Sequence, residues 1–307
     1  MKEKKTRKKL SKEGYSALIM LVPCVVFLIV CSIYPIIWTI RWVPYNYNGV
    51  KSTFTGWANF KRLFTDSLFW NSVLHTFEYA FYKIIFIIPL ALLVTVLLQQ
   101  KLIGSSLFRG IYFMPTIIST AIAGMIFTFL FSTNNGVVNA VFLKLGWLKE
   151  PARWLSTQSL VMIPVTVLAI WGGFGNYMLY FTTGMSSIDT QVYEAAKIDG
   201  ATQSQTFFRV TLPMMAPTLK VVLQLALLSA FKDYEAIMVL TQGGPANRSM
   251  TMFLNNYYTI FGTMVGNEVI SQPQIGYGAL CSLVAALIVG LVTIVYLRVS
   301  KRLDDVV

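Results

Sequence analysis

Charged and polar side chains inside long apolar stretches are the residues of this sequence that could do chemistry. One set recurs at about 100° per residue, the period of a helix, and comprises Asn71, His75, Glu78, Tyr79, Tyr82 and Lys83. An ionisable group within a bilayer costs roughly 2.5–3.5 kcal/mol unless it faces protein or water. The stripe therefore faces a bundle interior or a cavity, where it either lines a solute pathway or holds helices together as partnered charges.

A second set of charges, Lys232, Asp233 and Glu235, lies in the outer half of another apolar stretch, and the same cost applies to it. A third feature is the segment 171–177, which holds three glycines within four positions. These glycines mark either close helix packing or a local break, and a break beside an aromatic ring would suit a sugar. The predicted substrate pathway therefore comprises Glu78, Tyr79, Tyr82, Lys83, Trp171, Asn176, Tyr177, Lys232, Asp233 and Glu235.

Motifs of enzymes and metal sites are absent from the sequence. No glycine is followed by lysine, so there is no phosphate-binding loop of the GxxxxGK[ST] type. There is also no zinc spacing, nucleophile elbow or dinucleotide fingerprint. Cys24, Cys31 and Cys281 lie in apolar runs, and His75 is the one histidine. We expect a protein that is not an enzyme, with no catalytic residues and no bound cofactor or metal.

The composition is that of a polytopic membrane protein. Of the 307 residues, 55% are apolar and 12% are charged, whereas soluble domains average roughly 25% charge. The apolar residues form runs of about 20 or more, enough for a helix to cross the ~30 Å hydrocarbon core. The net charge of +12 includes seven basic residues among the first twelve. Such a tail is a topology signal that contacts anionic lipid, not a footprint of nucleic-acid binding.

The apolar runs predict an all-α integral membrane protein with six transmembrane helices. The expected spans are about 17–40, 71–98, 110–131, 158–181, 217–240 and 276–297. The expected regions are a basic cytoplasmic tail (1–16), the first span with an outer loop (17–70), a transmembrane core (71–298) and a cytoplasmic tail (299–307). The first run is too long for a secretory signal.

The distribution of basic residues predicts the orientation in the cell membrane. With the tail inside, the inner segments hold 14 Lys and Arg and the outer loops hold 8. This bias places both termini and the loop between the fourth and fifth spans in the cytoplasm.

That inner loop, residues 189–213, is polar and carries signals of ordered structure. Asp189 or Thr190 can cap a short helix, and Gly200 can end it with a positive φ. Thr202 and Gln205 have the spacing of a capping box, which predicts a second short helix.

The same loop carries a resemblance to a known family. Glu194-Ala195-Ala196, then Gly200, then the segment 210–213 (VTLP) resemble the EAA signature of binding-protein-dependent ABC importer permeases. The family usually has Ile where this chain has Val210. The segments 170–217 and 231–245 are similar to the MalF-type branch, which imports sugars, although Lys232 interrupts the usual aromatic-Asp pair. The resemblance extends from about the second span onward.

The resemblance implies a type I ABC importer permease with a cytoplasmic coupling helix between the fourth and fifth spans. The implied partners are a second permease, two ATP-binding-cassette subunits that use ATP, an extracytoplasmic solute-binding protein and membrane lipid. The implied ATPase-coupling residues are Glu194, Ala195, Ala196, Asp199, Gly200, Leu212 and Pro213. Glu194 is the residue expected to pair with a basic group of the ATPase.

Two alternatives remain open at the level of the sequence. An importer of glycerol phosphodiesters or phosphate esters would use basic clamps, for which Lys83 and Lys232 are candidates. A secondary transporter driven by an ion gradient would show inverted repeats and broken helices near the midplane. The residues do not specify which sugar or other solute is carried.

Overall fold

The structure, a computed structural model, describes residues 12–99, 105–265 and 268–304. Most of the predicted basic tail and the expected turn at Lys101 lie outside the described residues. The chain divides into two compact units. The first unit contains residues up to 64 together with 259–283, and the second contains 65–258 together with the chain from 284.

The first unit begins with one long apolar helix and continues into short elements. A short π-helical stretch lies within this helix, which nevertheless forms one continuous span from Leu18 to Trp42. The elements are α1 (Lys12–Leu28), η1 (Ile29–Ile33), α2 (Tyr34–Trp42), β1 (Tyr45–Tyr47), β2 (Ser52–Phe54), α3 (Ala58–Thr65), β3 (Thr263–Val265), β4 (Glu268–Ser271) and the start of α15 (Ile275–Asp304).

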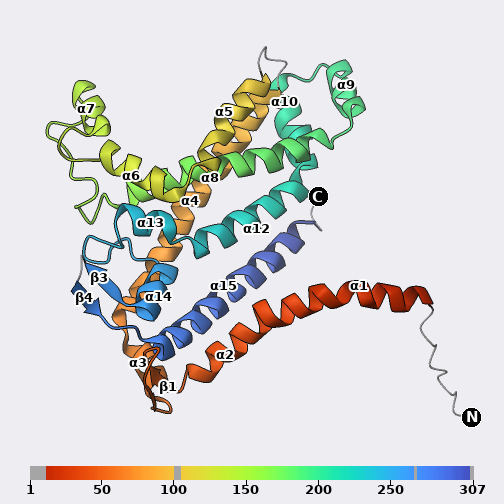
Figure 1. Ribbon diagram of the computed structural model, residues 1–307. Coiled ribbons are helices and arrows are strands. Elements are labelled where there is room, and N and C mark those ends of the chain that lie inside the picture. The colour runs from red at the N-terminus through yellow and green to blue at the C-terminus, as the bar shows by residue number, and fades with distance from the viewer. Residues whose placement is uncertain (1–11, 100–104, 266–267, 305–307) are drawn as a thin grey trace, which may run out of the picture. The chain divides into compact units, whose positions relative to one another are not determined.

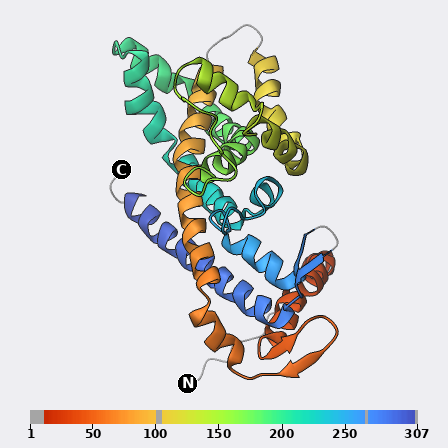
Figure 2. The same cartoon turned by 90° about the vertical axis from the view of Figure 1, so that its left-hand side faces the viewer.

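Two small antiparallel hairpins, which the sequence analysis did not predict, belong to this unit. In the first, Tyr45 pairs with Phe54 across strands β1 and β2 (Figure 2). The turn carries Gly49 at φ +96°, a conformation that glycine adopts at little cost. Buried Asn59 of α3 donates to the carbonyls of Val43 and Tyr45 at 2.7 and 3.0 Å. This amide joins α3 to the chain that leaves the first span.

The second unit is a bundle built around the 33-residue helix α4. Figure 1 shows α4 crossing α8 and α12, which are its main packing partners. The elements are α4 (Ser67–Gln99), α5 (Ser105–Ile117), α6 (Thr120–Leu130), α7 (Val137–Lys144), α8 (Met162–Ser186), α9 (Thr190–Ile198), α10 (Gln203–Thr206), η2 (Phe207–Thr211), α11 (Leu212–Met214), α12 (Ala216–Lys232), α13 (Glu235–Leu240) and α14 (Met252–Phe261). Both α14 and α15 contribute residues to the two units.

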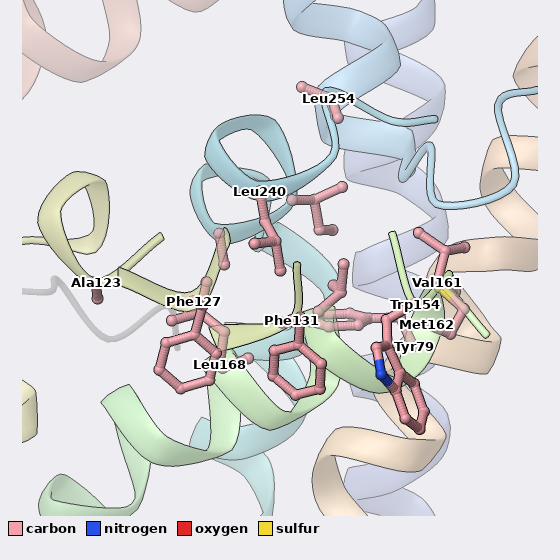
Figure 3. Packing of buried hydrophobic residues seen from close by; sticks show 14 of the residues in the cluster. Tyr79, Ala123, Phe127, Phe131, Trp154, Val161, Met162, Leu168, Leu240 and Leu254 are labelled. Carbon is pink, nitrogen blue, oxygen red and sulfur yellow. The ribbon is translucent and has the colours of Figure 1, made fainter. Parts of the chain in front are cut away.

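Two apolar clusters hold this bundle together. The first gathers side chains of α4, α6, α8 and α13, among them Tyr79, Phe127, Phe131 and Leu168 (Figure 3). The second joins α4, α8 and α12 around fully buried Phe181. Lipid tails are as apolar as these side chains, so helix association in a membrane depends on close van der Waals packing and hydrogen bonds.

Glycines of α8 allow that close packing. A Cβ added to Gly175 would lie 2.7 Å from the Thr116 hydroxyl and 3.1 Å from the Tyr112 carbonyl of α5. A Cβ added to Gly184 would lie 2.5 Å from the hydroxyl of Thr218 in α12. Helix α8 runs without interruption through the segment 171–177. Within this segment Gly175 serves close packing, whereas an added Cβ at Gly172 would meet no atom within 4 Å. The alternative prediction of a break there is wrong.

The described residues contain four helices long and apolar enough to cross a membrane, or up to six if two bent pairs each count as one span. The four are Leu18–Trp42, Ser67–Leu98, Met162–Ser186 and Ile275–Lys301. The bent pairs are Gly110–Ile117 with Thr120–Leu130, at 101°, and Gln203–Met214 with Ala216–Lys232, at 70°.

Two expected spans differ from the structure in shape. The segment 110–131 is not one straight helix, because Ser119 leaves the helical region with ψ 134° and starts a new helix as its N-cap. The fifth span does not continue to Leu240. It ends at Lys232, because Asp233 is extended (φ −71°, ψ 127°) and α13 begins only at Glu235.

Candidate solute pathway and coupling segment

A buried charged cluster joins α4 to the end of α12. The Lys83 ammonium lies 2.8 Å from Oδ2 of Asp233, and the Tyr79 hydroxyl donates to the same oxygen at 2.5 Å. Ser229 of α12 lies 3.4 Å from the ammonium. Tyr79 and Lys83 are one turn apart on α4, so both reach the same carboxylate. With side-chain exposures of 6% and 18%, Lys83 and Asp233 form a paired charge that costs far less than either ion alone.

A second ion pair joins α4 to the loop before α14. Arg248 contacts both carboxylate oxygens of Glu78, at 2.7 and 2.6 Å, in a bidentate arrangement. The hydrogen bonds that the Arg248 guanidinium donates to the Glu78 carboxylate raise its pKa above its ordinary value. Sequence reasoning missed Arg248. Its position as the one basic residue of a predicted outer loop could have drawn attention to it. Its partner Glu78 could not be identified from the sequence, because it is 170 positions away.

The Glu78–Arg248 pair lies at a groove of about 730 Å³ between α4 and α8. The groove has aromatic walls, which are formed by Tyr82, Trp171 and Phe174. The hydroxyl side chains of Ser159 and Thr166 also line it. An aromatic face beside a charged, hydrogen-bonding pair is able to bind a hydroxyl-rich solute, because the ring covers apolar C–H groups while the charged pair contacts hydroxyls. A smaller pocket of about 190 Å³ is lined by Lys83, Asp233 and Glu235.

The structure thus brings some predicted pathway residues together and separates others. The α4 stripe is divided between two places, with Glu78 and Tyr82 at the groove and Tyr79 and Lys83 in the buried cluster. Trp171 joins the groove. Asp233 belongs to the buried cluster, and both Asp233 and Glu235 line the smaller pocket. The other three predicted residues line neither the groove nor the smaller pocket: Tyr177 is buried in the second apolar cluster, and Asn176 and Lys232 are exposed.

The predicted coupling segment, residues 189–213, has the local structure that its residues predict. Asp189 caps α9, accepting a hydrogen bond from the amide of Gln191 at 3.0 Å. Gly200 follows the helix at φ +74°. Thr202 and Gln205 form both bonds of the capping box that starts α10. Each of these local predictions is confirmed.

The surface of α9 is open to solvent. Figure 1 shows α9 in the connection between α8 and α12, beside α10 and away from the crossing of α4 with α8. Of the predicted coupling residues, Glu194, Ala195, Asp199, Gly200 and Pro213 are exposed, Leu212 is half-buried and Ala196 is buried.

Sequence reasoning missed Ile198, whose side chain is 86% exposed. The signal was available, because an isoleucine stands between two charged residues, Lys197 and Asp199, at the end of a short amphipathic helix. An exposed aliphatic side chain between charged residues at the end of a helix is the kind of group that a protein partner covers.

Known proteins share this architecture. The structure aligns with that of a bacterial ABC transporter involved in the import of the acidic polysaccharide alginate, at a TM-score of 0.79 and 20% identity over 95% of this chain and 96% of that one. The chain is 29% identical to the arabinooligosaccharides transport system permease protein AraP of Bacillus subtilis, covering 91% of this chain and 86% of AraP. It is 30% identical to the multiple sugar-binding transport system permease protein MsmF of Streptococcus mutans, covering 86% of each.

The match to one protein family covers most of the chain. Residues 87–305 match the family described as binding-protein-dependent transport system inner membrane component. This range includes the predicted coupling segment, residues 87–98 of the second span and all of the later spans. The chain therefore belongs to the family of binding-protein-dependent transport system inner membrane components, the permease subunits of ABC importers.

Proposed function

We propose that this protein is the permease subunit of an ATP-driven importer that takes up a sugar or an oligosaccharide from an extracytoplasmic binding protein. Family membership and the sugar-transport names of AraP and MsmF support the solute class. The observation that carries the coupling role is α9, an exposed, capped helix that ends in a left-handed glycine and presents bare Ile198.

In this proposal the chain crosses the membrane six times, with each bent helix pair acting as one span. The termini and α9 face the cytoplasm, in agreement with the distribution of basic residues. The permease pairs with a second permease subunit, and two ATP-binding-cassette subunits dock beneath. This chain binds no cofactor, since the ATP is used by those subunits.

Helix α9 would transmit the state of the ATPase pair to the bundle. The ATPase lowers the free energy of one permease state relative to another by binding α9 more tightly in that state. Ile198 supplies apolar contact area, and Glu194 supplies a carboxylate for a basic group of the ATPase. The turn at Gly200 sets the angle between α9 and α10, through which the motion reaches α12.

The groove of Glu78, Tyr82, Trp171 and Arg248 is the proposed contact surface for the solute in this subunit. The phosphate-ester alternative is weakened, because Lys83 is already paired with Asp233 and is 5% exposed. Its other candidate, Lys232, is exposed and lines neither the groove nor the smaller pocket. The ion-gradient alternative is disfavoured by the family to which the chain belongs.

The test is to extract the protein from its native membrane in mild detergent and to identify by mass what accompanies it. A second permease, an ATP-binding-cassette ATPase and a solute-binding protein would support the proposal. The reconstituted complex should then import a labelled oligosaccharide only with ATP inside and binding protein outside. Isolation of the chain alone, or uptake driven by an ion gradient without ATP, would refute it.

A further inference from the structure

The first unit contains a polar pocket that none of the functions above uses. Its volume is about 770 Å³, and it is formed by the β1–β2 hairpin, α3, the residues before α15 and the first turn of α15. Its lining includes Asn46, Asn48, Lys51, Arg62, Gln274 and Tyr277. Helix α2 ends at Trp42 and α15 begins at Ile275, so the pocket lies where the first span ends and the last span begins.

Several groups in the pocket are held in place by contacts within the unit. The Arg62 guanidinium donates to Oε1 of Gln274 at 2.5 Å and lies 3.9 Å from the centre of the Tyr277 ring. Oδ1 of Asn48 accepts the backbone N–H groups of Val50 and Lys51 at 3.0 and 2.8 Å. Groups that are already fixed lose little conformational entropy when a ligand binds.

The charge of the pocket is positive. Lys51 and Arg62 line it, and no Asp or Glu is among the lining residues. Across the described ranges, the Lys51 ammonium makes neither an ion pair nor a side-chain hydrogen bond. Since like-signed groups in a concave site raise the local concentration of counter-ions, the pocket favours a ligand that carries a carboxylate or another anionic group.

The other lining groups match a ligand rich in hydroxyls. The side-chain amides of Asn46 and Gln274 can each donate and accept, whereas Asn48, whose Oδ1 already accepts two backbone N–H groups, can donate through its amide nitrogen. Two threonine side chains, Thr53 and Thr55, add hydroxyl groups. The volume lies within the roughly 300–1,000 Å³ typical of small-ligand sites.

We propose that this pocket binds an acidic saccharide, with Lys51 contacting its carboxylate and the amides contacting its hydroxyls. The inference rests on the proposed function, because it assumes that saccharides reach this protein. It adds a second saccharide site, in a separate unit from the groove of Trp171, and a preference for negative charge.

The test is calorimetric titration of the purified full chain in nanodiscs of zwitterionic lipid. Trigalacturonate is the acidic probe, and maltotriose is the uncharged one. The acidic probe should bind more tightly, and Lys51→Gln should weaken it about fivefold at low salt, with a smaller effect at 1 M salt. Maltotriose binding should not respond to that substitution. The matched control is Lys149→Gln, which removes an exposed lysine outside the pocket and should change neither titration.

The outcomes separate this inference from the function on which it rests. If Lys51→Gln and Lys149→Gln weaken trigalacturonate binding equally, or if trigalacturonate does not bind, the acidic-saccharide site is overturned even if the complex still imports sugar. If Lys51→Gln instead weakens capture of the solute-binding protein while trigalacturonate fails to bind, the pocket is a protein-docking site and the inference is overturned. If the complex imports no saccharide at all, the proposed function fails, and binding of trigalacturonate by the chain alone then measures the pocket independently.

Discussion

Replacing Gly200 with valine tests whether the turn after α9 carries the coupling. Gly200 has φ +74°, and a Cβ added there would meet no atom within 4 Å. The substitution therefore introduces no clash, and its cost is the backbone conformation alone. A left-handed residue costs an L-amino acid about 1–2 kcal/mol, and a β-branched side chain lies at the upper end. A penalty of about 2 kcal/mol shifts the turn equilibrium roughly thirtyfold.

A matched control exists at Gly146, which follows α7. It has φ +73°, and an added Cβ would again meet no atom within 4 Å. The same backbone hydrogen bond closes both helix ends. It runs from Ala201 N to Ala196 O at 3.0 Å around Gly200, and from Trp147 N to Phe142 O at 2.9 Å around Gly146. Gly146→Val thus carries the same backbone penalty in a loop with no proposed part in coupling.

The assay is ATP-dependent uptake of a labelled oligosaccharide by the reconstituted importer, with the amount of permease in the membrane measured in parallel. We expect Gly200→Val to lower uptake to below about a tenth, as the thirtyfold shift allows, while Gly146→Val leaves it near the unsubstituted level. Gly200→Asn should lie between them, because asparagine adopts the left-handed region more readily. Equal uptake by the two valine variants would refute the assignment of coupling to this turn.

Three further predictions follow from the contacts. Asp233→Asn should destabilise the protein by about 3 kcal/mol, because Lys83 is left as a buried unpaired charge. Adding Lys83→Met should recover part of that loss, and thermal unfolding in detergent measures both variants. If the destabilisations of the two single variants simply add in the double variant, the pairing is contradicted. Gly175→Ala should cost about 1–3 kcal/mol by forcing α5 from α8, whereas Gly172→Ala meets no atom within 4 Å and should be neutral or slightly stabilising in the same unfolding assay. Ile198→Asp should weaken binding of the ATPase by about 2 kcal/mol, roughly thirtyfold in affinity, and Ile198→Leu is the conservative control. If the ATPase is recovered with the Ile198→Asp permease in unchanged amount on purification, Ile198 has no docking role.

The coupling segment could be predicted from the sequence because its structure is local. The Asp189 cap, the Gly200 turn and the box of Thr202 with Gln205 each involve residues within five positions of one another. Local signals of this kind do not depend on where the rest of the chain lies. The hairpin of β1 and β2 carried a similar signal in Asn48-Gly49, an Asn-Gly pair between aromatic residues, and could have been found in the same way.

The ion pairs and the helix bends could not be predicted in this way. An apolar run shows that a helix crosses the membrane, but its composition does not say where the helix turns, as at Ser119. The cost argument correctly implied that Glu78 and Lys83 face protein or a cavity. It did not identify the partners, since Arg248 and Asp233 are 170 and 150 residues away and the pairing depends on packing.

Both partners of the α4 charges lie outside regular helix, and this has a consequence for the proposed mechanism. Asp233 is the extended residue at the end of α12, and Arg248 lies in the loop before α14. At its other end, α12 continues through the bent junction to α10 and α9. With 17 residues at about 1.5 Å each, α12 is a rod of about 25 Å. A rigid rod moves at both ends, so a displacement of α9 by the ATPase would reach the Lys83–Asp233 contact without any change within α12 itself. In the proposed mechanism, this contact would be a point at which ATP binding alters the bundle beside the proposed solute groove.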